Sequence, residues 1–165
     1  MDNFNTKTTE KTTNVWLTPI DFLQKLGTFD LDPCAAIGRP WDCATENYTI
    51  QENGLLHPWH GRVWLNPPYG KEAAPFVARM AEHKKGLALI FMRSDTRWFQ
   101  DFVLNTAHYI FLLRGRIRFC TIDGTPGQAP NAASCLVAWH SSELPLLQLL
   151  EQQNMGKLVY LQNEN

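Results

Sequence analysis

The chain has 165 residues, of which 44% are hydrophobic and 12% are aromatic. This length suits one compact domain with a hydrophobic core and is too short for two ordinary domains, and the aromatic content excludes a wholly disordered chain. The first 14 residues are polar and rich in Thr, Asn and Lys. We therefore expect a flexible N-terminal arm at 1–14, followed by a single domain at 15–165.

The net charge of −1 is unevenly distributed along the chain. Residues 1–70 carry five basic and eight acidic residues, a net −3, and residues 119–165 carry one and four, also −3. Residues 71–118 carry nine and four, a net +5. This basic middle segment indicates a surface that faces phosphates, with an ordinary solvated face as the alternative.

Hydropathy and cysteine spacing narrow the class of protein. No apolar run approaches the ~20 residues of a membrane helix, and the N-terminus lacks the apolar core of a signal peptide. A soluble cytoplasmic protein without a membrane partner is expected. The four cysteines contain no Cys-x-x-Cys pair and have no histidine at a zinc-finger spacing. Reduced thiols are the expectation, a zinc site is the alternative, and no metal is assigned.

The segments alternate in type along the chain. Helices are predicted over 18–26, 71–83, 95–106 and 144–153. The first would be capped at Thr18, with Pro19 in its first turn, and would end at Gly27. Strands are predicted over 28–32, 62–65, 86–92, 109–113, 116–121, 135–139 and 157–161, with a Gly/Pro/Asn-rich loop over 120–133.

This alternation predicts a three-layer, Rossmann-like α/β domain with a mostly parallel sheet. The close pair of strands near the end is joined by a loop rather than a helix, which predicts an antiparallel hairpin at one edge. Such sheets bind ligands at the carboxyl ends of their strands. Two predicted strands end in a polar residue followed by proline, at Asp32-Pro33 and at Asn66-Pro67-Pro68-Tyr69.

The segment from Asn66 to Tyr69 differs from a generic turn. Two prolines fix two φ angles near −65° and remove two backbone donors. An amine on an aromatic ring is a poor nucleophile, but acceptors that hold both of its hydrogens favour a pyramidal nitrogen. Asn66 Oδ1 and the Pro67 carbonyl can do this, and Tyr69 can stack on the base, a contact worth about 1–3 kcal/mol. A base in duplex DNA must first be flipped out. A rigid proline turn after a buried strand is the alternative.

Asn-Pro-Pro-Tyr resembles the catalytic motif of amino-methylating, S-adenosylmethionine-dependent enzymes. Further segments are similar to one branch, the small phage-type DNA adenine methyltransferases related to Dam. They are Trp16–Pro19, Phe29–Ala35, Glu46–Tyr48, Asn53–Leu55, Trp59–Gly70, Asp95–Phe99 and Arg114–Phe119. The resemblance implies a methyltransferase domain that transfers a methyl group from S-adenosylmethionine to the exocyclic amine of adenine in DNA. A phage-encoded protein would act in the cytoplasm of a bacterial host.

The resemblance also implies a cofactor pocket. It places the methionine end near Trp16, Thr18 and Pro19, and the cofactor loop after the first strand. That loop comprises Asp32, Pro33, Cys34 and Ala35. Related enzymes usually have a glycine-rich turn there. Here the turn is absent, and small residues allow the close approach instead. The Asp32 carboxylate is expected to face the ammonium of the cofactor or to fix the loop.

Only 29 residues separate Asp32 from Arg62. A β-α-β unit alone takes about 30 residues, so the cofactor half of the domain must be abbreviated. Either the adenosine pocket is shallow, or Glu46, Asn47 and Asn53 form it from loops. Glu46 is the first choice for a ribose contact, and Asn53 is expected beside the adenine of the cofactor.

The basic middle segment supplies the expected DNA contacts. The arginines assigned to phosphates are Arg93, Arg97, Arg114, Arg116 and Arg118. Arg116 and Arg118 alternate with apolar residues and are expected to share one face of a strand, which is also what a soluble edge strand would show. The polar loop 121–131 would lie over the target base or read a groove. No separate recognition domain is visible, so sequence specificity should be short or relaxed.

Two other functions fit part of this pattern. The same loop would polarise an amine on an RNA base or a glutamine amide in a protein. A catalytically silent nucleic-acid-binding relative would also explain the missing glycine-rich turn and the short interval. The intact Asn66–Tyr69 segment favours the enzyme.

Overall fold

The computed structural model describes residues 15–161 and 163, and the arm expected at 1–14 lies outside them. The α-helices are α1 (Ile20–Gln24), α2 (Ala73–His83), α3 (Arg97–Phe99) and α4 (Leu144–Gln152). Short 3-10 turns are η1 (Gly54–Leu56), η2 (Gly70–Glu72) and η4 (Ser141–Glu143), and η3 (Gln100–Leu104) is a π-helical turn. The strands are β1 (Leu31–Asp32), β2 (Glu46–Asn47), β3 (Val63–Leu65), β4 (Gly86–Phe91), β5 (Tyr109–Leu113), β6 (Ser134–Ala138) and β7 (Gly156–Tyr160).

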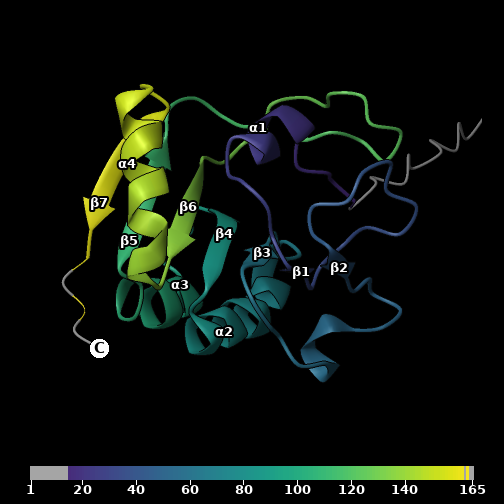
Figure 1. The fold of residues 1–165 in the computed structure, drawn as a ribbon, viewed down its shortest axis with the longest axis horizontal. Coiled ribbons are helices and arrows are strands. Elements are labelled where there is room, and N and C mark those ends of the chain that lie inside the picture. The colour runs from purple at the N-terminus through teal and green to yellow at the C-terminus, as the bar shows by residue number, and fades with distance from the viewer. Residues whose placement is uncertain (1–14, 162, 164–165) are drawn as a thin grey trace, which may run out of the picture.

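The strands form one sheet in the order β2-β1-β3-β4-β6-β5-β7 (Figure 1). The pairings from β2 to β4 are parallel, and those of β4 with β6, β6 with β5, and β5 with β7 are antiparallel. The mixed α/β class is confirmed, whereas a parallel sheet holds only for the half from β2 to β4. The predicted antiparallel pair of strands is present as β5 and β6, but β7 lies outside it and forms the edge of the sheet. Strand β6 pairs with β4 on one side and with β5 on the other, and all five of its residues are buried.

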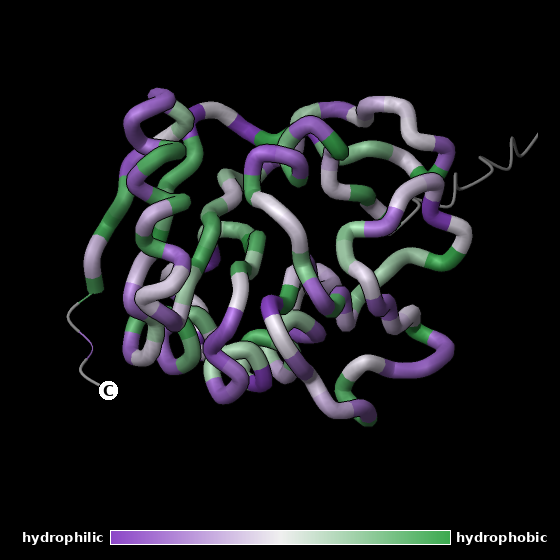
Figure 2. The backbone as a smooth tube through the Cα atoms, viewed as in Figure 1, coloured by the Kyte–Doolittle hydropathy of each residue, from purple (hydrophilic) through white to green (hydrophobic). Residues whose placement is uncertain are grey.

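Helices cover both faces of the sheet, as the three-layer prediction requires. On one face, α2 with the α3–η3 helix buries Val77, Met80, Phe99 and Val103. On the other face, α1 and α4 bury Leu23, Leu26, Leu147 and Leu150. Figure 2 shows the apolar residues concentrated in the central strands and the polar ones in the connecting loops. The core therefore fixes the positions of the strand ends.

The predicted strand over 116–121 is wrong. Within it only Cys120 pairs with other chain segments, through isolated bridges to Leu17 and Pro126. The physical reason is a lack of partners, because β6 begins at Ser134 and β7 at Gly156, both level with the end of β5 at Leu113. An alternating pattern beyond that level has no ladder to join. Arg116 and Arg118 therefore do not share a strand face.

Three local predictions need smaller corrections. The first helix is shorter than predicted, and Pro19 rather than Thr18 is its N-cap, without a side-chain cap. The helix over 95–106 is one α turn followed by the π-helical η3. Glu46 and Asn47, expected in loops, form the short edge strand β2. The interval between Asp32 and Arg62 thus holds one two-residue strand and one 3-10 turn, which agrees with an abbreviated half.

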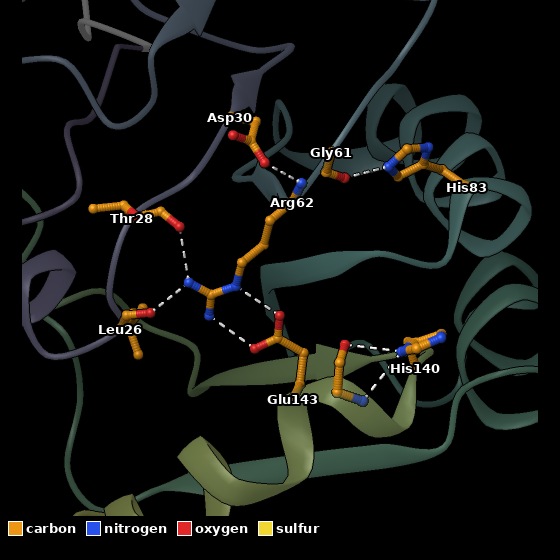
Figure 3. A network of polar contacts seen from close by, with 9 residues as sticks. Leu26, Thr28, Asp30, Gly61, Arg62, His83, His140 and Glu143 are labelled. Atoms are coloured by element: carbon orange, nitrogen blue, oxygen red, sulfur yellow. Dashed lines mark hydrogen bonds and ion pairs between the residues drawn. The ribbon is translucent and has the colours of Figure 1, made fainter.

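Arg62 and Glu143 join the two halves of the molecule (Figure 3). The guanidinium of Arg62 donates to both carboxylate oxygens of Glu143, at 2.7 and 2.8 Å. It also donates to the carbonyls of Leu26 and Thr28. The Arg62 amide donates to Asp30 Oδ2 at 2.7 Å. This network fixes β1, β3 and the start of α4 at the edge opposite the carboxyl ends of the parallel strands. Among the described residues, no helix has the length and apolarity to cross a membrane.

Candidate active site

Polar side chains follow the parallel strands at one edge of the sheet. Asp32 and Asn47 end β1 and β2, and Asn66 and Arg93 follow β3 and β4. The register pairs Asp32 with Asn47, so their side chains point to the same face of the sheet. The parallel direction of β1 to β4 therefore brings separately predicted residues to a common rim.

The side chain of Asn66 contacts Thr18, which belongs to the segment Trp16–Pro19, called the N-terminal motif below. Its Nδ2 donates to the hydroxyl oxygen of Thr18 at 3.2 Å. Thr18 is only 2% exposed, and its carbonyl accepts a hydrogen bond from Trp41 Nε1. Asn66 Oδ1 has no hydrogen-bond partner among the described residues. The amide is thus held by its nitrogen while its oxygen stays available as an acceptor.

The N-terminal motif is itself held by the long loop after β5. Leu17 and Cys120 exchange two backbone hydrogen bonds, each of 2.8 Å. The ring of Trp16 lies against Gly127, where an added Cβ would meet it at 2.6 Å. Any side chain at 127 would displace Trp16, and with it the segment that carries Thr18. The loop therefore positions the motif whether or not it also contacts a substrate.

An aromatic cluster lies beside Asn66. The Tyr69 ring stacks on Phe91 with 4.8 Å between centroids and 23° between planes, and Phe119 meets Phe91 edge-on. Tyr69 remains 39% exposed, and partial burial raises the pKa of its hydroxyl to about 12. It is therefore neutral at physiological pH. A pocket partly open to solvent is lined by Asn66–Gly70 and by side chains that include Phe91, Arg93 and Trp98.

The segment after β1 forms a tight turn. The amide of Cys34 donates to Asp32 Oδ1 at 3.0 Å, and Asp32 is only 4% exposed. Burial raises the pKa of the Asp32 carboxyl to about 7. Gly54 lies so close that an added Cβ would meet the Pro33 carbonyl at 2.2 Å. The loop containing Asn53 and the loop containing Pro33 are thus in direct contact.

Glu46 and Asn53, which were expected to contact the ribose and the adenine of the cofactor, already have hydrogen-bond partners in the protein. Glu46 is exposed and accepts a hydrogen bond from the Tyr48 hydroxyl, and its other oxygen pairs with His60. These bonds hold the pKa of Glu46 below its usual range. Asn53 Oδ1 accepts from the Leu55 amide. Asn47 Oδ1, by contrast, is buried without a partner among the described residues. Asn47 lies beside Asp32 in the register of β1 and β2, a neighbour that no sequence pattern indicates.

The five arginines assigned to phosphates are all exposed, but they differ in their contacts. Arg116 donates to the Pro130 carbonyl and Arg118 to the Gly127 carbonyl, so both close the loop after β5. Arg114 donates to Asn154 Oδ1. Arg93 lines the pocket, and Arg97 begins α3. Of these five arginines, Arg93 is the one that lines the pocket containing Asn66.

A family model described as DNA N-6-adenine-methyltransferase (Dam) matches residues 5–159. The chain belongs to the Dam family. Searches of curated proteins and of solved structures gave no match. The family assignment establishes an adenine DNA methyltransferase with DNA as its substrate class. Within the described part of this Dam-family chain, no group of three or more His, Cys, Asp or Glu side chains could hold a metal ion.

Proposed function

We propose that the chain transfers a methyl group from S-adenosylmethionine to N6 of adenine in DNA, with Asn66–Tyr69 as the catalytic segment. The observation that carries this proposal is the arrangement of Asn66. Thr18 holds its nitrogen, and its oxygen faces no competing donor among the described residues. An acceptor fixed in advance at the reacting nitrogen stabilises developing positive charge without reorganisation.

The chain's acceptors fit the cofactor. S-adenosylmethionine supplies, when bound, a methyl group activated on a sulfonium. Its ammonium and ribose hydroxyls are donors, and the edge formed by β1 and β2 presents the Asp32 carboxyl and the unpartnered Asn47 Oδ1. A buried acceptor without a partner costs about 1–3 kcal/mol, so a ligand donor there would stabilise the folded chain. Thr18, Pro19 and Trp16 would border the methionine end.

The residues around Asn66 would orient the base. Asn66 Oδ1 and the Pro67 carbonyl accept the two N6 hydrogens and draw the nitrogen lone pair out of conjugation. Tyr69 presents the ring face that is not packed on Phe91. Its neutral hydroxyl keeps the site free of a phenolate charge. Positioning and polarisation of this kind are the main contributions that a protein makes when the methyl donor is already activated.

The site's surroundings favour a nucleic-acid base over a glutamine side chain, and the family model indicates DNA as the nucleic acid. Tyr69, Phe91 and Trp98 line the pocket, and aromatic walls stack on bases more readily than on a glutamine amide. Arg93 lies in the same pocket, where it can reach a phosphate beside the flipped base. The described strands all belong to one sheet, so site recognition would be short and would come from loops such as 121–131.

Transfer of a labelled methyl group to DNA, RNA and protein fractions tests this proposal. We expect incorporation into DNA, recovered as N6-methyladenine. Asn66→Ala should lower kcat by about 100-fold or more, as removal of one preorganised polar group does. Asn105→Ala, an exposed asparagine far along the chain, is the matched control and should keep full activity. Label in RNA or protein alone, or an active Asn66→Ala, would overturn the proposal.

A further inference from the structure

Ser134 is a polar residue in an otherwise apolar buried strand. It begins β6, whose remaining residues are Cys135, Leu136, Val137 and Ala138, all of them fully buried. Ser134 is 3% exposed, and its hydroxyl has no hydrogen-bond partner among the described residues. A buried hydroxyl left in this state costs about 1–3 kcal/mol. Native proteins keep few such groups, and they often serve function.

The position of Ser134 connects it to the catalytic segment. In the β4–β6 ladder it lies opposite Phe91, so the two side chains share one face of the sheet. Phe91 in turn stacks on Tyr69. Ser134 also lines the same pocket as Asn66 and Pro67. Ser134 thus lies at the pocket in which the target amine would be held.

Adenine presents a complementary group at that place. Its N6 amine is flanked by two ring nitrogens, N1 and N7, which accept hydrogen bonds and carry no hydrogen. When Asn66 and Pro67 take the amine hydrogens, one of these ring nitrogens must face the wall beside them. A serine hydroxyl donates, and neither Phe91 nor Phe119 offers a donor there.

We propose that Ser134 is a binding residue for the target base, whose hydroxyl donates to a ring nitrogen of adenine beside N6. This inference rests on the proposed function and deepens it. The base would satisfy the hydroxyl, for which the described part of the chain offers no partner. Asn66 Oδ1 and the Pro67 carbonyl would recognise the amine of the base. Ser134 would add a preference for a base that has a ring acceptor next to this amine.

The test combines variants of the protein with variants of the base. Ser134→Ala should lower kcat/KM on adenine-containing DNA about 3- to 10-fold, which corresponds to one neutral hydrogen bond. Oligonucleotides with 1-deazaadenine or 7-deazaadenine at the target each lack one ring nitrogen. With one of these two oligonucleotides, the wild-type protein should lose as much activity as Ser134→Ala loses on adenine-containing DNA. Ser134→Ala should lose no further activity on that oligonucleotide. Ser141→Ala, an exposed serine beyond the other end of β6, is the control.

Thermal unfolding separates a binding role from a structural one. Because the hydroxyl has no partner among the described residues, Ser134→Ala should keep or raise Tm while activity falls. A lower Tm, full activity of Ser134→Ala, or additive losses with both analogues would overturn the inference and leave the proposed function standing. A wild-type chain that methylates no DNA would refute the proposed function and the role of Ser134 with it.

Discussion

The hydrogen bond between Thr18 and Asn66 joins segments 48 residues apart, and its removal gives a sharp test of the site. Valine keeps the shape of threonine without the hydroxyl, so Thr18→Val deletes this bond in a position that is 2% exposed. One neutral hydrogen bond contributes about 0.5–1.5 kcal/mol, and about 1.4 kcal/mol is tenfold in rate. We expect kcat to fall about 2- to 13-fold because the Asn66 amide loses its orientation.

Steady-state methyl transfer with DNA and S-adenosylmethionine varied separately measures this effect. The loss should lie in kcat, with the KM for DNA unchanged, and Thr18→Ser should restore most of the rate. In an Asn66→Ala background, Thr18→Val should cause no further loss. An equal loss in both backgrounds would refute positioning through Asn66, whereas a raised KM for S-adenosylmethionine would show that Thr18 also borders the cofactor.

Three further outcomes follow from other parts of the structure. The pKa of Asp32 is about 7 in the folded chain, against an ordinary value of 3.8. Between these two pH values the folded chain binds one more proton than the unfolded chain. The free energy of unfolding therefore falls as pH rises from 3.8 to 7, by up to about 4 kcal/mol. Asp32→Asn should remove this decline in Tm measured from pH 4 to 8, and an unchanged profile would contradict it. Glu143→Ala strands the Arg62 guanidinium and should lower the free energy of unfolding in urea by about 2 kcal/mol or more, with kcat retained. Arg93→Ala should weaken DNA binding in anisotropy titrations and reduce the slope of log K against log salt concentration by about one. The control Lys157→Ala, on the edge strand β7, should change neither quantity. Equal effects of the two substitutions would show that Arg93 does not contact DNA.

Long apolar periods made most of the fold predictable. The buried run of β4 and the amphipathic α2 lie where the pattern places them, within one residue for β4 and two for α2. The strand expected at 116–121 failed because polar and apolar residues can alternate in a loop as well as in a strand. Only the positions of β6 and β7 show that no partner exists there. The short strand β2 was missed because two residues carry too little pattern to be recognised.

The site divides in a similar way. Asn66–Tyr69 could be assigned from its own residues, since proline geometry and an amide acceptor are local chemistry. Ser134 could not, because a serine next to a cysteine and a leucine has no distinguishing pattern. Its importance depends on an absent hydrogen bond and on Phe91 across the ladder, and both are properties of strand pairing.

By itself the sequence determined the catalytic segment, the α/β class and the abbreviated stretch between Asp32 and Arg62, because each depends on residues close together in the chain. The tertiary structure alone decided that Thr18 holds Asn66, that Asn47 lies beside Asp32, and that β6 inserts between β4 and β5. These contacts join residues separated by tens of positions. Burial and hydrogen-bond satisfaction across the whole sheet select them, and no local pattern encodes that sum.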